Sequence, residues 1–207
     1  EPTNPDHLGQ EIKVGRRGSF SGVIRVTGKQ GHVAYPHKAD NPLPRLIKLL
    51  DALAGHVFDK GNEFFQPTNL EITSIDVGNT ADNVIPPRGE ARFNIRFNNN
   101  WNHKTLEAEV RKILDRIGVP YELTCFYGAE CFLTQPGTWS ELVKQAVKDI
   151  TGKTAAFTTT GGTSDARFVA HYCPVVEFGG INATIHQTDE NSDVAVLEDQ
   201  TRIYARI

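Results

Sequence analysis

The side chains best suited to hydrolytic chemistry are histidines and acids on two turn-rich segments, the first of which surrounds His186. Asp189 and Glu190 follow His186 on an expected loop. A hydrolytic zinc site needs three protein ligands, usually histidines and carboxylates, plus an open position. None of the seven histidines pairs at the i, i+4 spacing of an HExxH helix. The segment therefore predicts a single metal ligand, and an ordinary polar surface loop is the alternative.

The second segment, residues 31–37, sets His32, Tyr35 and His37 among turn-forming residues. Loops fixed by a rigid scaffold often carry functional side chains. The stretch therefore predicts a functional loop. A connector in which His32 only packs locally is an equal alternative.

A third segment, Thr160-Gly161-Gly162-Thr163-Ser164-Asp165, favours anion binding. Its glycines free backbone N–H groups just before a predicted helix N-terminus, where anions bind readily. It lacks the lysine of a P-loop, and Ser164 lacks the GxSxG pattern of a nucleophile elbow. A plain helix-capping loop is the alternative.

Cationic side chains complete the set of candidates: Arg16, Arg17, Arg96 and Arg167. A single exposed arginine is usually solvated surface. Several converging arginines would suit a dicarboxylate ligand, because guanidinium binds carboxylate in a bidentate way.

The elements that must position these residues fall into two parts. Strands are predicted at 20–27, 70–77, 90–97 and 121–127, because each run is rich in β-branched or aromatic residues or alternates with period two. Helical spacing puts one apolar set on a face near 43–54 and another near 106–117: Leu43, Leu46, Ile47, Leu50, Leu53 and Ala54, then Leu106, Val110, Ile113, Leu114 and Ile117. This β-α-β-β-α-β order predicts a ferredoxin-like sandwich with an antiparallel sheet.

The rest of the chain, residues 1–16 and 130–207, has α/β character but no complete sheet of its own. Residues 1–18 are expected to be loop, 142–150 and 196–207 to be helical, and 174–178 to be a short buried strand. We therefore expect an α/β protein with an α+β insertion, divided into 1–16, a compact domain over 17–129, and 130–207.

Composition limits the function classes. The chain has 207 residues, 39% of them hydrophobic and 23% charged, with a net charge of −3. That balance argues against a generally basic nucleic-acid surface, and no apolar run reaches membrane-spanning length. Three cysteines without CxxC spacing favour a reducing compartment, so we expect a cytoplasmic protein. The absence of methionine indicates a piece of a longer protein.

Five motifs in order carry a resemblance to a known family: Gly15-Arg16-Arg17-Gly18-Ser19, Gly31-His32-Val33-Ala34-Tyr35-Pro36-His37, Asn83-Val84-Ile85-Pro86, Gly161-Gly162-Thr163-Ser164-Asp165-Ala166-Arg167-Phe168 and Asn182-Ala183-Thr184-Ile185-His186. Together they resemble the M20 metallopeptidase family of dinuclear zinc hydrolases. The resemblance implies a catalytic domain split by an inserted lid that also forms the homodimer. Residues 17–129 would be that lid, and 130–207 the C-terminal part of the catalytic domain.

The resemblance also implies a metal site to which residues outside this sequence contribute the other ligands. Glu1 and His186 match ligands of the two zinc ions, and cobalt is a possible substitute. The remaining ligands and a glutamate general base would lie upstream of residue 1, in an HxD followed by Glu-Glu.

Further roles are implied residue by residue. His32 matches the lid histidine that crosses the dimer and stabilises the oxyanion. Residues around the substrate carboxylates would be Arg16, Ser19, Gly162, Thr163, Arg167 and Asn182, and those reaching the site from the partner subunit would be Tyr35, Asn83 and Arg96. The family usually has Asn before Asn83, where this chain has Asp82.

The implied activity is removal of a succinyl group from a small N-succinyl amino acid, with neither nucleic acid nor membrane as partner. Two alternatives stand beside it. The chain alone would be an inactive lid and dimerisation fragment, or its parent would remove another acyl group, such as acetyl.

Overall fold

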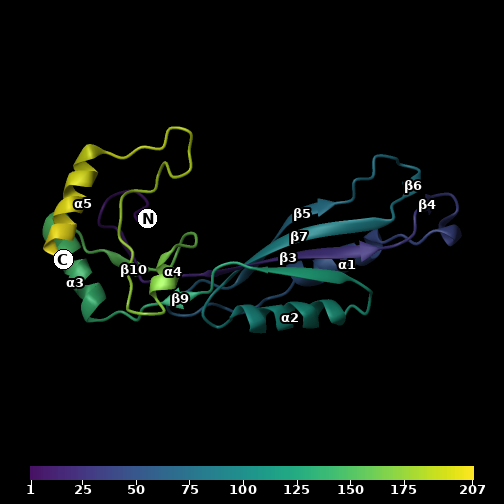
Figure 1. Ribbon diagram of the computed structural model, residues 1–207, viewed down its shortest axis with the longest axis horizontal. Helices are drawn as coiled ribbons and strands as arrows, with labels where there is room; N and C mark the ends of the chain where they lie inside the picture. The colour runs from purple at the N-terminus through teal and green to yellow at the C-terminus, as the bar shows by residue number, and fades with distance from the viewer. The chain divides into compact units, whose positions relative to one another are not determined.

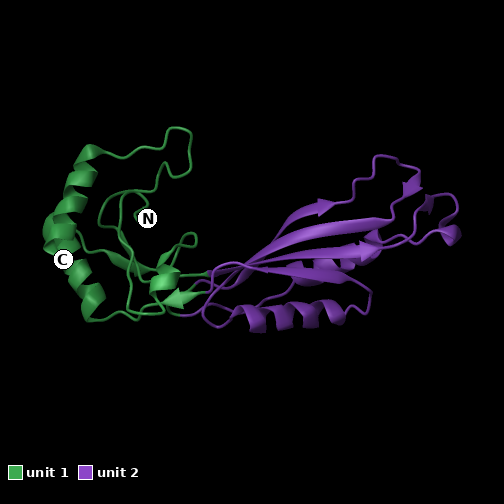
Figure 2. Cartoon of the chain, viewed as in Figure 1, with its two compact units in different colours: residues 1–17, 63–65, 131–207 green, residues 18–62, 66–130 purple.

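The computed structural model describes all 207 residues and forms two compact units, coloured separately in Figure 2. Unit 1 contains residues 1–17, 63–65 and 131–207, and unit 2 contains 18–62 and 66–130. The chain contains no helix with the length and apolar character needed to cross a membrane.

Unit 2 is built on one four-stranded antiparallel sheet with two helices. In chain order its main elements are β3 (Gly18–Thr27), α1 (Leu43–Ala54), β5 (Asn69–Asp76), β7 (Arg88–Phe97), α2 (His103–Asp115) and β8 (Glu122–Tyr127). The strand order across the sheet is β5-β7-β3-β8, with antiparallel pairing throughout. Figure 1 shows both helices on the same side of the sheet. The predicted ferredoxin-like arrangement is confirmed.

Apolar and polar side chains alternate along β7, and the apolar ones form part of the buried face of this sheet. Phe93 and Phe97 point into the core, where each is almost fully buried, while Arg92 lies on the opposite, exposed face. Two glycines of β3 make room for these rings. Gly22 and Gly18 lie opposite Phe93 and Phe97, and a Cβ on either glycine would come within 2.2 Å of the facing ring.

The two helices cover that face through leucine-rich stripes. Helix α1 begins with Pro44 in its first turn and buries Leu46, Leu49, Leu50 and Leu53. Ile47, which the spacing placed on this stripe, is instead 63% exposed, because Leu49 fills the inward position. Helix α2 starts at an Asn102–Thr105 capping box and buries Leu106, Val110, Ile113 and Leu114.

A small hairpin-like tip extends unit 2 beyond the main sheet (Figure 1). Strand β4 (Gly31–His32) pairs antiparallel with β6 (Val84–Ile85), and a short 3-10 helix, η1 (Pro36–Lys38), follows β4. The sequence predicted only a loop here, because two-residue strands are too short to show periodicity.

Unit 1 contains a parallel pair, β1 (Glu11–Lys13) with β10 (Ala156–Thr158), and an antiparallel pair, β2 (Gly15–Arg16) with β9 (Phe132–Leu133). Helices α3 (Thr138–Thr151) and α5 (Val194–Arg206) contribute to one core, and α4 (Ala166–Val169) is a single turn. The buried members of the core are Leu8, Ile12, Val143, Ala146, Val147, Ala155, Phe178 and Ile203.

Two expectations for unit 1 were wrong. Residues 1–18 are not all loop, since β1 and β2 form there through partners far along the chain. The predicted strand at 174–178 reduces to a single bridge between Glu177 and Lys13. The Val175 N–H donates to the Thr134 side-chain oxygen Oγ1 at 3.0 Å, so it does not extend a ladder with a neighbouring strand.

Candidate functional site

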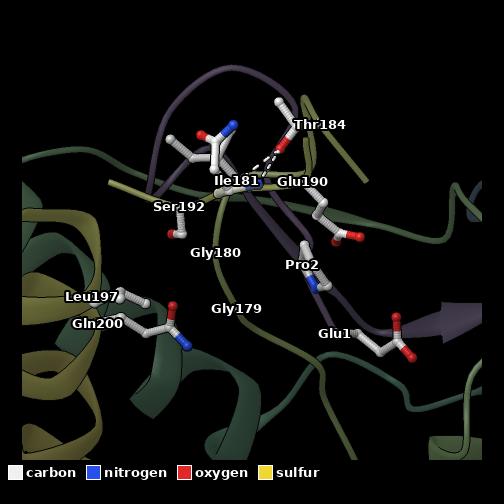
Figure 3. A pocket seen from close by; sticks show the side chains of 11 residues that line it. Glu1, Pro2, Gly179, Gly180, Ile181, Thr184, Glu190, Ser192, Leu197 and Gln200 are labelled. Carbon is white, nitrogen blue, oxygen red and sulfur yellow. Dashed lines mark hydrogen bonds between the residues drawn. The ribbon is translucent and has the colours of Figure 1, made fainter. Parts of the chain in front are cut away.

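Glu1 lines a pocket of about 420 Å³ in unit 1, shown in Figure 3. The segment 179–181 forms one wall, and Leu197 and Gln200 of α5 form another part of the lining. The carboxylates of Glu1 and Glu190 lie on the same side of the view in Figure 3. The lining of the pocket therefore includes two carboxylates, those of Glu1 and Glu190.

The segment carrying Glu1 is tied to the 179–182 segment by hydrogen bonds. Asn4 Nδ2 donates to the Gly179 carbonyl at 2.6 Å, and Gly179 N–H donates to Thr3 Oγ1 at 3.1 Å. Gly179 also packs directly on the Glu1 backbone, where an added Cβ would lie 2.1 Å from the Glu1 carbonyl oxygen. Only glycine therefore permits this approach, which fixes the position of Glu1.

His186 lies on the turn that follows this pocket wall. Its backbone adopts a positive φ of 60°, the only such non-glycine residue in the chain. Its N–H donates to Glu190 Oε2 at 3.3 Å, so the turn links His186 to a pocket carboxylate. A strained backbone of this kind clusters at functional sites.

The side chains of Glu1 and His186 are suitable metal ligands, but they are too few to hold a divalent ion. Carboxylate and imidazole are ordinary zinc ligands. However, no three His, Cys, Asp or Glu side chains of the chain gather closely enough to hold an ion. Glu1 and His186 therefore suit single contributions to a larger centre, and they do not form a complete one.

Arg16 is buried and already engaged within unit 1. Its Nε donates to Glu177 Oε2 at 2.6 Å, and its Nη1 donates to the Thr160 carbonyl at 2.9 Å. Nη2 is the guanidinium nitrogen that neither contact uses. Arg16 thus lies directly beneath the glycine-containing loop that the sequence singled out.

That loop, residues 160–165, contains open and orphaned polar groups. Gly162 has open space where a side chain would be, and Thr163 is half-buried. The Ser164 hydroxyl is buried without a hydrogen-bond partner. Buried hydroxyls are normally hydrogen-bonded, so Ser164 is an exception in this loop.

Arg167 and Asn182 complete the predicted residues of unit 1. Arg167 Nη1 donates to the Ser164 carbonyl at 2.9 Å, and its guanidinium stacks over Phe168 at 4.4 Å. Asn182 is held by its backbone, because its N–H donates to the Asn4 carbonyl at 2.8 Å.

In unit 2, Ser19 and Arg96 lie opposite each other on β3 and β7. Both are on the sheet face away from the helices and are half-buried. Asn94 Nδ2 donates to Ser19 Oγ at 3.2 Å. The structure therefore brings these two predicted residues together.

A second group of unit 2 lies at the β4–β6 tip. The rings of His32 and Tyr35 are 5.7 Å apart, and Val33 N–H donates to the Asn83 carbonyl at 3.1 Å. His32, Tyr35 and Asn83 are therefore neighbours. They lie beyond the far end of β3 from Ser19, so unit 2 carries two separate clusters of predicted residues (Figure 1).

Sequence reasoning missed two residues that the structure connects to these clusters. Glu177 pairs with Arg16, and Asn79 donates hydrogen bonds within the turn that carries Asn83. Glu190, which the sequence placed on the loop after His186, lies in the Glu1 pocket. Nothing local marked Glu177, since its partner is 161 residues earlier in the chain.

The fold and its motifs define a family. Residues 14–122, more than half of the chain, match the model of the M20 peptidase dimerisation domain. The chain belongs to this family.

Among curated relatives, the succinyl-diaminopimelate desuccinylase of Xanthobacter autotrophicus is 51% identical over the whole chain, which covers 56% of that protein. The enzyme of the same name from Rhodospirillum centenum is 53% identical, again over the whole chain and 54% of the relative. The chain thus spans about half the length of the curated relatives it matches.

Solved structures confirm the α/β fold. An aminopeptidase from Bacillus cereus superposes with a TM-score of 0.76 at 19% identity, over 99% of this chain and 54% of the other. An M20 family metallo-carboxypeptidase from Sulfolobus solfataricus gives 0.77 at 15% identity, over 100% and 60%. These neighbours share the architecture of the chain.

Proposed function

We propose that the protein to which these residues belong hydrolyses N-succinyl-LL-2,6-diaminopimelate to succinate and LL-2,6-diaminopimelate. Such a reaction would serve diaminopimelate and lysine biosynthesis in the cytoplasm. The observation that carries the proposal is identity of 51% and 53% to two succinyl-diaminopimelate desuccinylases over the entire chain. The five motifs lie within that matched length.

In this proposal unit 1 binds the substrate carboxylates. Gly162, Thr163 and the orphaned Ser164 hydroxyl offer hydrogen-bond donors on one loop. Arg16 contributes the guanidinium nitrogen that its internal contacts leave unused. Arg167 and Asn182 extend the polar surface, and a carboxylate is a natural partner for such donors.

Unit 2 supplies the residues that act across a homodimer. His32 donates from its imidazole to the oxygen on which negative charge develops, and Tyr35 and Asn83 orient the substrate beside it. Ser19 and Arg96 provide a second polar pair on the open sheet face. The dimerisation-domain match over residues 14–122 supports assembly through this unit.

Glu1 and His186 would each hold one of two divalent metal ions, zinc or cobalt, with other ligands from sequence outside these 207 residues. When bound, such ions polarise the amide carbonyl and make water a stronger nucleophile. The 207-residue chain alone contains no complete set of ligands, so we propose that it does not hydrolyse the substrate by itself.

Hydrolysis by the intact protein tests the proposal. Metal-loaded enzyme should release succinate from N-succinyl-diaminopimelate and contain about two metal equivalents per subunit. Matched assays with N-acetyl amino acids separate the alternatives. Preference for an acetyl substrate would assign the protein to another acyl-removing activity of the family.

A further inference from the structure

Glu177 carries a buried carboxylate that none of the proposed functional roles uses. Its Oε2 accepts a hydrogen bond from Arg16 Nε at 2.6 Å, and the two side chains are only 9% and 7% exposed. The Glu177 backbone is fixed as well. Its N–H donates to the Lys13 carbonyl at 2.8 Å, and Lys13 N–H donates back to the Glu177 carbonyl at 2.9 Å. Glu177 therefore holds the guanidinium from a rigid position.

The guanidinium in turn holds the loop above it. Arg16 Nη1 donates to the Thr160 carbonyl at 2.9 Å. The next residue, Gly161, has a φ of +98°, and a Cβ there would lie 2.4 Å from Arg16 Nη1. The loop and the guanidinium can approach this closely only because Gly161 has no side chain.

A second buried ion pair supports the same loop. Lys13 is almost fully buried, pairs with Glu11, and donates from Nζ to Thr160 Oγ1 at 2.7 Å and to Thr158 Oγ1 at 2.9 Å. Burial alone would raise the pKa of the Glu11 carboxyl, but hydrogen bonds from Lys13 and Thr158 outweigh it and lower that pKa. Thr160 is therefore held by its carbonyl and by its hydroxyl, just before the open Gly162–Thr163 backbone.

We propose that Glu177 is a positioning residue for substrate binding: it fixes Arg16, which fixes the loop 160–163 in the conformation that receives the substrate carboxylate. This inference rests on the proposed function, because that function assigns the loop to carboxylate binding. Glu177 itself does not touch the substrate. Its effect passes through Arg16 and Thr160.

A positioning role has a kinetic signature that loss of folded protein lacks. A loop that binds a non-reacting carboxylate holds ground state and transition state equally, so its displacement raises KM and leaves kcat nearly unchanged. Partial unfolding instead reduces the amount of active enzyme. That would lower apparent kcat at constant KM.

The first experiment compares Glu177→Gln with Asp149→Asn in the intact, metal-loaded enzyme. Glu177→Gln keeps the shape but removes the charge that Arg16 faces. We expect KM for N-succinyl-diaminopimelate to rise on the order of tenfold or more, with kcat within about twofold of wild type. Asp149→Asn removes an exposed ion pair of the same unit, with Arg206, and should leave both constants unchanged.

A second pair of variants tests the loop without removing a buried charge. Gly161→Ala places a methyl group against Arg16 Nη1, whereas Gly152→Ala adds one at a similar positive φ of 70° with nothing within 4 Å. Both substitutions place a Cβ on a residue with positive φ, +98° at Gly161 and +70° at Gly152. Only Gly161→Ala should raise KM and accelerate amide hydrogen exchange of residues 160–163.

Unchanged KM in Glu177→Gln and Gly161→Ala would overturn the positioning role, as would a fall in kcat at constant KM. Hydrogen exchange distinguishes this failure from failure of the proposed function. If wild-type enzyme does not hydrolyse the succinyl substrate, the function is wrong. In that case, unchanged exchange of residues 160–163 in Glu177→Gln would separately reject the coupling between Glu177 and the loop.

Discussion

The backbone N–H of Ala34 donates a hydrogen bond to Nδ1 of His32 at 3.0 Å. Nδ1 is therefore an acceptor, and neutral His32 carries its proton on Nε2. The ring therefore has an N–H donor at Nε2, the nitrogen that is not hydrogen-bonded to the Ala34 backbone. A donor of this kind suits an oxygen that becomes negative during amide hydrolysis.

His32→Ala in the intact enzyme is accordingly expected to lower kcat by roughly a hundredfold while changing KM much less, because an oxyanion contact strengthens in the transition state. Steady-state kinetics with the succinyl substrate measures both constants. His37→Ala removes a neighbouring imidazole from the same tip and serves as the control. A kcat for His32→Ala equal to that of the control would reject the role.

Asn79 is expected to hold the turn beside His32. Its Nδ2 donates to the Val84 carbonyl at 2.9 Å and to the Ala81 carbonyl at 3.2 Å. Because an exposed hydrogen bond contributes about 1 kcal/mol, Asn79→Ala should speed amide exchange of Val33 by about fivefold or more.

Asp82→Ala is the matched control for Asn79→Ala, since Asp82 lies in the same turn and its side chain makes no hydrogen bond there. Hydrogen-exchange mass spectrometry of residues 30–35 measures the effect. Equal exchange in the two variants would show that Asn79 does not support the tip.

The sequence predicted the elements that depend on local patterns, and it did not predict the pairings between residues far apart in the chain. Alternation along β7 and the leucine stripe of α1 are local patterns, and they were enough to predict the sheet and its helices correctly. β1 has only three residues, and its partner β10 begins 145 residues later, so no local pattern marked it.

The candidate site shows the same division. The motifs located His32 and the 160–165 loop, but they did not show that Arg16 is buried against Glu177. Only the fold brings together residues so far apart in the chain. The motifs also could not show that Ser19 and Arg96 pair at one end of unit 2 while His32 and Asn83 lie at its tip.

The cysteines should differ in reactivity. Burial and the neighbouring Glu107 carboxylate raise the pKa of Cys125 to about 11, whereas Cys173 is exposed. At pH 8 roughly one Cys125 in a thousand would be thiolate, and the thiolate is the reactive form. Iodoacetamide should therefore label Cys173 at least about tenfold faster, as peptide mass spectrometry can measure. Comparable rates at the two residues would contradict the raised pKa of Cys125.

Asp59 should stabilise unit 2 in a pH-dependent way. Its carboxylate accepts hydrogen bonds from Gly61 N–H at 2.7 Å, Asn98 Nδ2 at 2.7 Å and Trp101 Nε1 at 2.9 Å. Partial burial alone would raise its pKa, but hydrogen bonds from these groups and Thr68 outweigh burial and lower the pKa. Asp59→Asn should therefore cost about 2–3 kcal/mol at pH 7, because these donors lose a charged acceptor.

The sign of the pH dependence follows from the lowered pKa of Asp59. Its contribution to the free energy of unfolding is present above the unfolded-state pKa of about 4 and is lost as pH falls through the lower folded-state value. Urea unfolding of wild type and Asp59→Asn should therefore differ at pH 7 and converge toward pH 3. Asp51→Asn, on the exposed surface of α1, provides the control. A difference between wild type and Asp59→Asn that stays constant from pH 7 to pH 3 would show that the hydrogen bonds do not depend on the charge of Asp59.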